Sequence, residues 1–293
     1  MVERAVSAEV DRVNSMIDIS RPDEIMQALA TDGACVVPNM LSDSLLENLR
    51  EDIDNGTRHC LEIQSRQKVG GSQALKEAAE GGDGALGGAA HHIVLFENSF
   101  FDLLLQRPLF EHIEKHLGGS PFILNSFGAV TNTNRNNMYE HGKTIHRDTR
   151  SFHPTFQQEC WLMVMVDEFT IENGATWMWS GSQTREHVPP EDEFYANAQQ
   201  VTGPAGSIVI FDGRIWHAAG KNVTDHPRRA LTISFTRPFI KPQMDYVRYF
   251  GAERVAGMPE TLQQLFGYFS RIPSNYDEWY QPPETRFYRS NQG

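Results

Sequence analysis

The stretch Thr144-Ile145-His146-Arg147-Asp148 places an imidazole and a carboxylate two residues apart. In an extended strand, side chains two residues apart point to the same face, so His146 and Asp148 can bind one metal ion. Another histidine, His217, follows a distant strand-like run. Two histidines and one carboxylate leave coordination positions open, which is typical of non-haem Fe(II) oxygenases. The sequence therefore predicts that these three residues are metal ligands.

A cationic side chain follows the second histidine. Arg228 lies eleven residues after His217. Its guanidinium is planar and permanently charged, so it can hold a carboxylate through two parallel hydrogen bonds. Arg229 is adjacent, but alternation along a strand places only one of the two inside a barrel. We expect Arg228 to bind a carboxylate co-substrate, with Arg229 as the alternative.

Strand-like runs surround these residues in the second half of the chain. They are bounded by turn residues and cover 122–127, 161–166, 207–211 and 230–235. The earlier part of the chain has apolar residues mainly at helical spacing, which returns after Pro259. This order predicts a mainly β fold with flanking helices (α+β), in which a sandwich or barrel carries helices outside.

We expect a single domain over residues 1–293, because no internal repeat and no clear linker interrupts the chain. Helical support is predicted for 1–120, the strand-rich core for about 121–240, and a C-terminal helix and tail for 241–293. Aromatic residues of the tail either pack on the domain or line a homodimer contact. The glycine-rich segment 65–90 and the segment 152–158 are candidate lids.

Composition narrows the partners. Lys and Arg total 26 against 38 Asp and Glu, a net charge of −12, which argues against a nucleic-acid binder. No apolar run is long enough to span a bilayer and no signal peptide is apparent, so we expect no membrane partner and a cytoplasmic location. Three widely spaced cysteines, without a C-x-x-C pair, are predicted to be reduced thiols. A small-molecule substrate is the expected partner.

Each predicted ligand also has a plain structural interpretation. His146 can be a hydrogen-bonded core histidine, Asp148 a turn residue and His217 a strand-end histidine. Their combination with Arg228 favours one shared site. Zinc accepts the same ligands, so a zinc-dependent enzyme is an alternative.

Longer motifs surround the predicted ligands. They are His-Arg-Asp at 146–148, Asp-Glu-Phe-Thr-Ile-Glu-Asn-Gly-Ala-Thr at 167–176, Gly-Ser-Ile-Val-Ile-Phe-Asp-Gly-Arg-Ile-Trp-His at 206–217, and the run 222–233. Together they resemble the phytanoyl-CoA dioxygenase family over roughly residues 25–240. The resemblance implies a double-stranded β-helix core (jelly-roll, cupin-like), Fe(II), O2 and 2-oxoglutarate as co-substrate.

The resemblance also implies roles for single residues. His146, Asp148 and His217 match the iron ligands of the family. Arg228 matches the residue that holds the distal carboxylate of 2-oxoglutarate.

Further residues are weaker candidates. Thr144 shares the face of His146 and is predicted to contact the co-substrate, whereas Lys143 points the other way unless the strand bulges. Phe152 matches an aromatic pocket position of the family, and Trp177 is a second predicted substrate contact. Relatives usually carry Pro-Gly-Ser-His where this chain has Ser-Gly-Ser-Gln at 180–183, which predicts a rebuilt pocket wall.

The implied reaction couples decarboxylation of 2-oxoglutarate, to succinate and CO2, with oxidation of a substrate C–H bond. Related halogenases have a small residue at the position of Asp148, so the carboxylate here favours hydroxylation, desaturation or ring closure. An acid-rich chain is a poor match for a polyanionic acyl-CoA, and a small molecule of specialised metabolism is the predicted substrate. The alternative is a non-catalytic metal-binding jelly-roll sensor, for which Arg228 would have no use.

Overall fold

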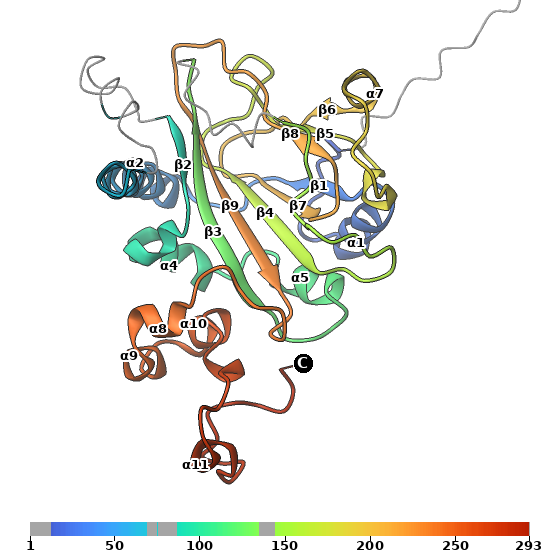
Figure 1. The fold of residues 1–293 in the computed structure, drawn as a ribbon. Helices are drawn as coiled ribbons and strands as arrows, with labels where there is room; N and C mark the ends of the chain where they lie inside the picture. Colours follow the sequence, from blue (N-terminus) through green and yellow to red (C-terminus); the bar gives the residue numbers. More distant parts are fainter. Residues whose placement is uncertain (1–12, 69–74, 76–86, 135–143, 293) are drawn as a thin grey trace, which may run out of the picture.

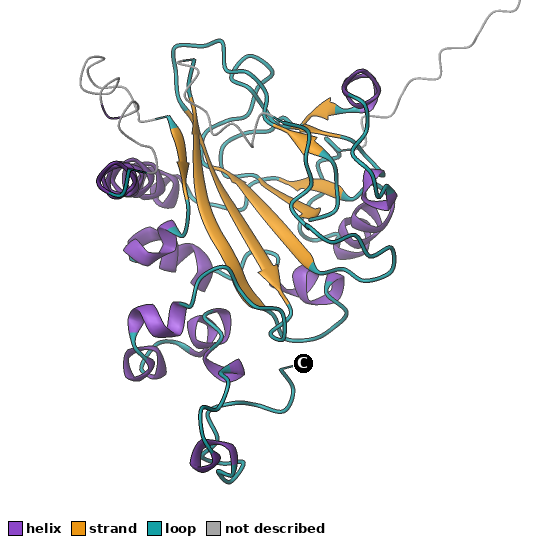
Figure 2. Cartoon of the chain, in the orientation of Figure 1, coloured by secondary structure: helices purple, strands orange, loops and turns teal. Residues whose placement is uncertain are grey.

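The computed structural model describes residues 13–68, 75, 87–134 and 144–292. The described residues form two antiparallel sheets, and helices surround the larger one (Figure 1 and Figure 2). This arrangement confirms the predicted mainly β fold with flanking helices.

The strands divide unequally between the sheets. The larger sheet contains β1 (Ala34–Val37), β2 (Gly88–Ala90), β3 (Ile123–Asn132), β4 (Glu159–Met165), β7 (Ile208–Asp212) and β9 (Arg228–Thr236), in the order β1-β7-β4-β9-β3-β2. The smaller sheet contains β5 (Trp177–Met178), β6 (Gln199–Gln200) and β8 (His217–Ala218), in the order β6-β5-β8. Residues 1–120, which were expected to give helical support, thus also supply both edge strands of the larger sheet, β1 and β2.

Alternating residues of the central strands face two different apolar clusters. Val164 of β4 pairs with Leu231 of β9, and both belong to the cluster shared with the helices. Met165 pairs with Ala230, and both belong to a second cluster that includes Met178 of the smaller sheet. On β9, even-numbered residues therefore point between the sheets and odd-numbered residues point toward the helices. The space between the sheets is the interior of the barrel.

Helices cover the outer face of the larger sheet. They are α1 (Pro22–Thr31), α2 (Asp43–Arg66), α4 (Asn98–Leu105), α5 (Phe110–His116), α8 (Tyr246–Phe250), α9 (Ala252–Ala256) and α10 (Glu260–Leu265), and each contributes to the first cluster. The remaining described helical elements are α7 (Glu191–Asn197), α11 (Tyr276–Trp279) and the 3-10 turns η1 (Ile93–Phe96), η2 (Ser182–Thr184) and η3 (Tyr268–Ser270). No described helix is both long and apolar enough to cross a membrane.

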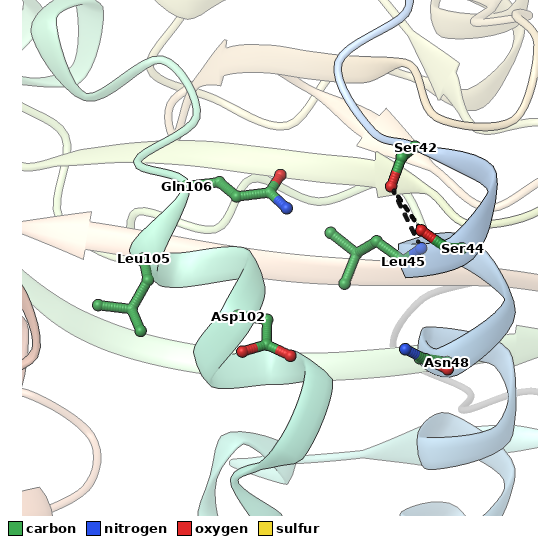
Figure 3. Close-up of a pocket in the computed structure, with 7 residues that line it drawn as sticks. All are labelled: Ser42, Ser44, Leu45, Asn48, Asp102, Leu105 and Gln106. Atoms are coloured by element: carbon green, nitrogen blue, oxygen red, sulfur yellow. Dashed lines mark hydrogen bonds between the residues drawn. The ribbon is translucent and has the colours of Figure 1, made fainter.

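A surface pocket of about 440 Å³ lies between α2 and α4 (Figure 3). It is lined by Ser42, Ser44, Leu45, Asn48, Asp102, Leu105 and Gln106. Ser42 caps α2 here, because its Oγ accepts a hydrogen bond from the Leu45 amide at 3.3 Å. This pocket lies on the helix side of the larger sheet and is separate from the barrel interior.

The C-terminal part begins with helices that share the main core and ends in a projecting tail. One apolar cluster runs from Ile17 to Phe266, which supports the single domain that we propose. In Figure 1, α11 lies apart from the sheets. The rings of Trp279 and Tyr288 stack on each other with centroids 5.8 Å apart, and Tyr280 is 74% exposed. A homodimer contact through this tail stays a prediction.

The cysteines agree with the expectation of unpaired thiols. Cys35 and Cys160 are buried, Cys60 is partly buried, and all of them are free.

Candidate metal and co-substrate site

His146 and His217 lie opposite each other in an antiparallel bridge. The His146 amide donates to the His217 carbonyl at 2.9 Å, and the His217 amide donates to the His146 carbonyl at 2.8 Å. Directly opposed residues point to the same face, and the two ring centroids are 4.2 Å apart. Asp148 shares this face: its carboxylate oxygens lie 3.8 Å from His146 Nε2 and 3.6 Å from His217 Nε2. The three candidate ligand atoms lie within 4.8 Å of one another.

Backbone carbonyls determine which nitrogen each imidazole turns toward Asp148. His146 Nδ1 lies 2.8 Å from the carbonyl oxygen of Thr144, and His217 Nδ1 lies 3.0 Å from that of Ile215. A carbonyl only accepts, so each Nδ1 carries the hydrogen and each Nε2 presents its lone pair toward the carboxylate. Histidines that bind metals are usually oriented in this way. The donor set therefore fits a divalent iron or zinc ion.

The turn at Gly213 fixes the position of Asp148. The amides of Asp148 and Thr149 both donate to the Gly213 carbonyl, at 3.0 and 2.9 Å. A Cβ at position 213 would lie 2.6 Å from Thr149 Oγ1 and 3.1 Å from the Trp161 ring. Only glycine allows this close approach. Gly213 therefore positions the segment that carries Asp148, and it lies four residues before His217, the second histidine.

Arg228 points into the barrel and is 2% exposed. Its Nη2 donates to the Gly174 carbonyl at 2.8 Å, and its Cζ lies 4.3 Å from the centroid of the Phe169 ring. Its Nε is buried without a hydrogen-bond partner. Burial lowers the pKa of Arg228 to about 10, against the opposing effect of Asp167. A buried guanidinium with a single carbonyl partner is costly by itself and suits a carboxylate ligand.

Arg229, the alternative anchor, lies on the other side of the sheet. Its Nε and Nη2 donate to the two carboxylate oxygens of Asp54 on α2, both at 2.8 Å. Its Nη1 donates to Asp167 at 3.1 Å. Its charge is therefore balanced within the protein, and Arg228 is the arginine that faces the barrel interior together with His217.

The residues that line the barrel interior are chemically suited to a dicarboxylate between the candidate metal ligands and Arg228. Met178, which pairs with His217, and Phe169, which lies against Arg228, belong to the same interior cluster. A keto acid group requires two open metal positions, and its distal carboxylate requires a fork-shaped cation. The residues present supply both, and the buried Nε of Arg228 is the donor that a carboxylate would satisfy.

Gly174 connects Arg228 to the adjoining turn. Its φ is +80°, and a Cβ there would lie 2.5 Å from Asn132 Nδ2, 2.6 Å from the Gly220 carbonyl and 2.7 Å from the Asn222 amide. Asn222 Nδ2 in turn donates to the Asn132 carbonyl at 2.9 Å. Gly174 therefore presents its carbonyl to Arg228 from a crowded turn that excludes any side chain.

Replacing Gly174 with alanine is expected to lower the free energy of unfolding by about 2–4 kcal/mol, because strain at positive φ adds to the crowding. Binding of 2-oxoglutarate should weaken as well, since the turn holds Arg228. Gly119→Ala is the matched control: its φ is +73° and nothing lies within 4 Å of the added Cβ. Urea denaturation and 2-oxoglutarate titration of both variants test this. Equal destabilisation by the two changes would contradict the crowding argument.

Glu159 is an acidic residue of the site that sequence reasoning missed. Trp161 Nε1 donates to its Oε2 at 2.9 Å, and Asn125 Nδ2 donates to its Oε1 at 3.4 Å. Burial raises the pKa of Glu159 to about 7, against the hydrogen bond from Trp161 and with a contribution from the charge of Asp148. Glu159 lies two residues before Trp161, so alternation from the predicted strand would have placed both on one face; the predicted strand began two residues too late.

The raised pKa of Glu159 predicts a pH dependence of stability. The ordinary pKa of this carboxyl is 4.5 and its folded value is about 7, so between these pH values the folded chain holds the proton more tightly than the unfolded chain does. Stability is therefore lost as pH rises through this window. Glu159→Gln should reduce the loss between about pH 5 and about pH 8 by about 1–3 kcal/mol. Urea denaturation of metal-free protein measures this, and identical pH profiles for both chains would contradict it.

Trp177 lies on the outer face of the smaller sheet, and its contact with substrate stays a prediction. In the pairing of β5 with β8, Trp177 is opposite Ala218, whereas Met178 is opposite His217. Trp177 therefore points to the outer face of the smaller sheet, where its ring meets that of Tyr195 on α7 at 5.4 Å. The sequence motif indicated the strand but left its register open.

Phe152 and Thr144 lie on either side of His146 and Asp148 in the sequence and make different contacts. The Arg147 guanidinium lies 5.2 Å from the rings of both Phe152 and Trp216, on the side of the chain opposite His146. The substrate contact predicted for Phe152 stays a prediction. Thr144 orients His146 through its carbonyl, and a contact of its hydroxyl with the co-substrate stays a prediction. Lys143 and most of segment 65–90 lie outside the described residues.

Segment 152–158 is held near His217 by Arg214, which also forms a buried ion pair with Asp212. Arg214 donates to the two carboxylate oxygens of Asp212 at 2.9 and 2.7 Å, and to the carbonyls of His153 and Pro154 at 2.8 and 3.0 Å. Burial raises the pKa of Asp212, but Arg214, with His116 beside it, outweighs this effect and brings the pKa to about 2. Arg214 therefore connects the turn before His217 to one of the candidate lids, whose lid function stays a prediction.

The segment that departs from the expected Pro-Gly-Ser-His pattern supports the second histidine. Ser182 Oγ accepts a hydrogen bond from the Trp216 amide at 2.9 Å, next to His217. Gln183 Nε2 donates to the carbonyls of Ala30 and Thr31, both at 3.3 Å. Ser182 and Gln183 thus connect the segment before His217 to the end of α1.

Comparisons with known proteins agree with this geometry. The family model for phytanoyl-CoA dioxygenase (PhyH) matches residues 29–230. An uncharacterized protein of Mycobacterium tuberculosis is 32% identical over 279 residues, which cover 92% of this chain and 96% of the relative. Dioxygenase andF of Emericella variicolor is 24% identical over 272 residues, 88% of each chain.

A solved structure extends the likeness to the fold. It is that of the non-heme alpha-ketoglutarate-dependent epimerase SnoN from nogalamycin biosynthesis, with a TM-score of 0.50 and 20% identity over 74% of this chain and 83% of that one. The described sheets, with their antiparallel order, agree with the jelly-roll core expected from the sequence. The family model covers more than half of the sequence, and the chain belongs to the phytanoyl-CoA dioxygenase family of 2-oxoglutarate-dependent oxygenases.

Proposed function

We propose that this oxygenase uses Fe(II) and 2-oxoglutarate to oxidise an unactivated C–H bond of a small metabolite, with release of succinate and CO2. The observation that carries the proposal is the joint presence, inside one barrel, of the His146–Asp148–His217 face and the buried Arg228 with its unpartnered Nε. A metal-binding sensor has no use for such a cation.

Each residue has a defined task in this proposal. His146 and His217 would bind iron through Nε2 and Asp148 through its carboxylate, while Arg228 would hold the distal carboxylate of 2-oxoglutarate. Iron, the co-substrate and dioxygen supply the oxidising chemistry when bound. The protein orients these groups and keeps water from them with an apolar lining that includes Met163 and Phe169.

The outcome for the substrate follows from the ligand set. Asp148 occupies the position that would have to be small for a halide to bind, which supports hydroxylation, desaturation or ring closure. A small molecule of specialised metabolism is the proposed substrate, and the likeness to an enzyme of nogalamycin biosynthesis supports this class.

Succinate release tests the proposal. Purified protein is incubated with Fe(II), ascorbate, 2-oxoglutarate and a panel of terpenoid and amino-acid-derived metabolites. We expect slow iron-dependent succinate formation without substrate and faster formation with a productive one. Zinc in place of iron should give none. A complete lack of iron-dependent succinate, or turnover supported by zinc, would contradict the proposal.

A further inference from the structure

Glu159 lies at one end of the barrel interior. It is the first residue of β4, and Trp161 and Met163 follow on the same face, which points between the sheets. Glu159 and Trp161 are only partly buried, whereas Cys160 and Leu162, on the opposite face, are fully buried under the helices. This end of the interior, which we call the opening, is therefore only partly covered by protein.

The metal face is close to this opening. The Gly213 amide donates to the Glu159 carbonyl at 3.3 Å, and the Gly213 carbonyl accepts from the Asp148 amide at 3.0 Å. Besides burial, the charge of Asp148 raises the pKa of the Glu159 carboxyl, as does that of Asp212, and the charge of Arg150, which forms no ion pair with Glu159, opposes them. A group that reaches Glu159 from the interior therefore lies beside the segment that carries Asp148.

The Glu159 carboxylate has acceptor capacity that the protein leaves unused. It receives the indole hydrogen of Trp161 at 2.9 Å and a long contact from Asn125 at 3.4 Å, and both donors are neutral. A carboxylate has about four lone-pair sites. None of the ion pairs within the described ranges 13–68, 87–134 and 144–292 involves Glu159.

Asp212, which precedes Gly213, provides a contrast to Glu159. Asp212 carries its own cation, because Arg214 donates to both of its oxygens. A half-buried carboxylate without such a partner is unfavourable for stability and suits a ligand donor. Glu159 therefore has the chemistry of a binding group, and Asp212 has that of a structural one.

Trp161 adds a flat surface next to the carboxylate. Its ring stacks on that of Phe211 with centroids 6.1 Å apart and an interplanar angle of 24°. Its indole hydrogen is taken by Glu159, so the two side chains hold each other in place. An aromatic face beside an acceptor suits a ring that carries a donor group.

We infer that Glu159 is a substrate-recognition residue, whose carboxylate accepts a hydrogen bond from a hydroxyl or a protonated amine on a ring that lies against Trp161. The inference rests on the proposed function, because it assigns the substrate side of the same site. It narrows the substrate class to small cyclic molecules with a hydrogen-bond donor near the C–H bond that is oxidised.

Matched fragments test this assignment without turnover. Benzyl alcohol, benzylamine and toluene share one ring and differ in the donor. Their binding is followed by saturation-transfer NMR at about pH 8, where Glu159 is ionised, on protein loaded with Zn(II) and 2-oxoglutarate. We expect signals from the alcohol or the amine and none from toluene. Glu159→Gln should weaken the donor-bearing fragment by about 10–100-fold, the scale of a hydrogen bond to a charged group, and abolish its signal.

A second carboxylate serves as the control. Glu168 is exposed beyond the opposite end of β4, so Glu168→Gln makes the same chemical change away from the opening and should leave the signals unchanged. A signal from the alcohol identifies a hydroxyl as the partner, and one from the amine alone identifies a cation.

Three outcomes would overturn the assignment: equal signals from toluene, an unchanged signal in Glu159→Gln, or no signal from either donor-bearing fragment. Anaerobic titration of Fe(II) and 2-oxoglutarate separates this failure from that of the proposed function. If the wild-type protein and Glu159→Gln both form the charge-transfer absorption of the chelated keto acid, the co-substrate site is intact and only the role of Glu159 is wrong. If neither does, the proposed function itself fails.

Discussion

Asp148→Ala is expected to abolish succinate formation and to lower the affinity for Fe(II) by more than about 100-fold, since loss of groups that merely orient metal ligands already costs about 10–100-fold. Asp148 is the only anionic member of the ligand face, and its oxygens lie 3.8 and 3.6 Å from the two Nε2 atoms. Removing it leaves two neutral imidazoles, which bind a divalent ion poorly by themselves.

Isothermal titration with Fe(II) under anaerobic conditions measures the first effect, and succinate analysis measures the second. Asp192→Ala, at an exposed position of α7, is the matched control and should leave both unchanged. Retention of iron affinity in Asp148→Ala would show that the metal is bound elsewhere.

Arg228→Ala is expected to raise the Kd for 2-oxoglutarate by about 100-fold or more, the usual cost of truncating one partner of a buried charge pair. The same change should leave the metal-free protein nearly as stable as before, or more stable. Arg228 is 2% exposed with one carbonyl partner, so its removal relieves an unfavourable burial. Arg228→Lys retains a charge without the planar fork and should recover only part of the affinity.

Arg229→Gln provides the contrast to this change. Arg229 bonds with Asp54 and Asp167 outside the barrel, so this variant should lose stability and keep its affinity for 2-oxoglutarate. Urea denaturation and co-substrate titration of the two variants measure both effects. The opposite assignment, with affinity lost in Arg229→Gln and retained in Arg228→Ala, would show that the wrong arginine had been chosen as the anchor.

Alternation along strands explains which parts of the site are predictable from sequence. His146 and Asp148 share a face because they are two residues apart, and the adjacent arginines diverge for the same reason. The structure places Arg228 inside and Arg229 outside, as expected. Each of these predictions needs only the local conformation of its own segment: Arg228 and Arg229 are on β9, and His146 lies in an isolated bridge outside the named strands.

Features that depend on strand register or on distant contacts were not predictable. The pairing of Trp177 with Ala218 turns Trp177 to the outer face of the smaller sheet, and this pairing joins segments about forty residues apart. The ion pair of Asp212 with Arg214 also depends on burial, which the sequence does not display. Glu159 also lies near Asn125 and the charge of Asp148, which only the fold brings to it.

The central claim is that one ferrous ion and one 2-oxoglutarate bind side by side between His146, Asp148, His217 and Arg228. Anaerobic addition of 2-oxoglutarate to the Fe(II)-loaded protein tests it directly, because chelation of ferrous iron by a 2-keto acid produces a visible charge-transfer absorption. We predict that this band forms in the wild-type chain, is absent in Asp148→Ala and requires much more co-substrate in Arg228→Ala. No band in the wild-type chain, or a band that neither substitution changes, would contradict the account.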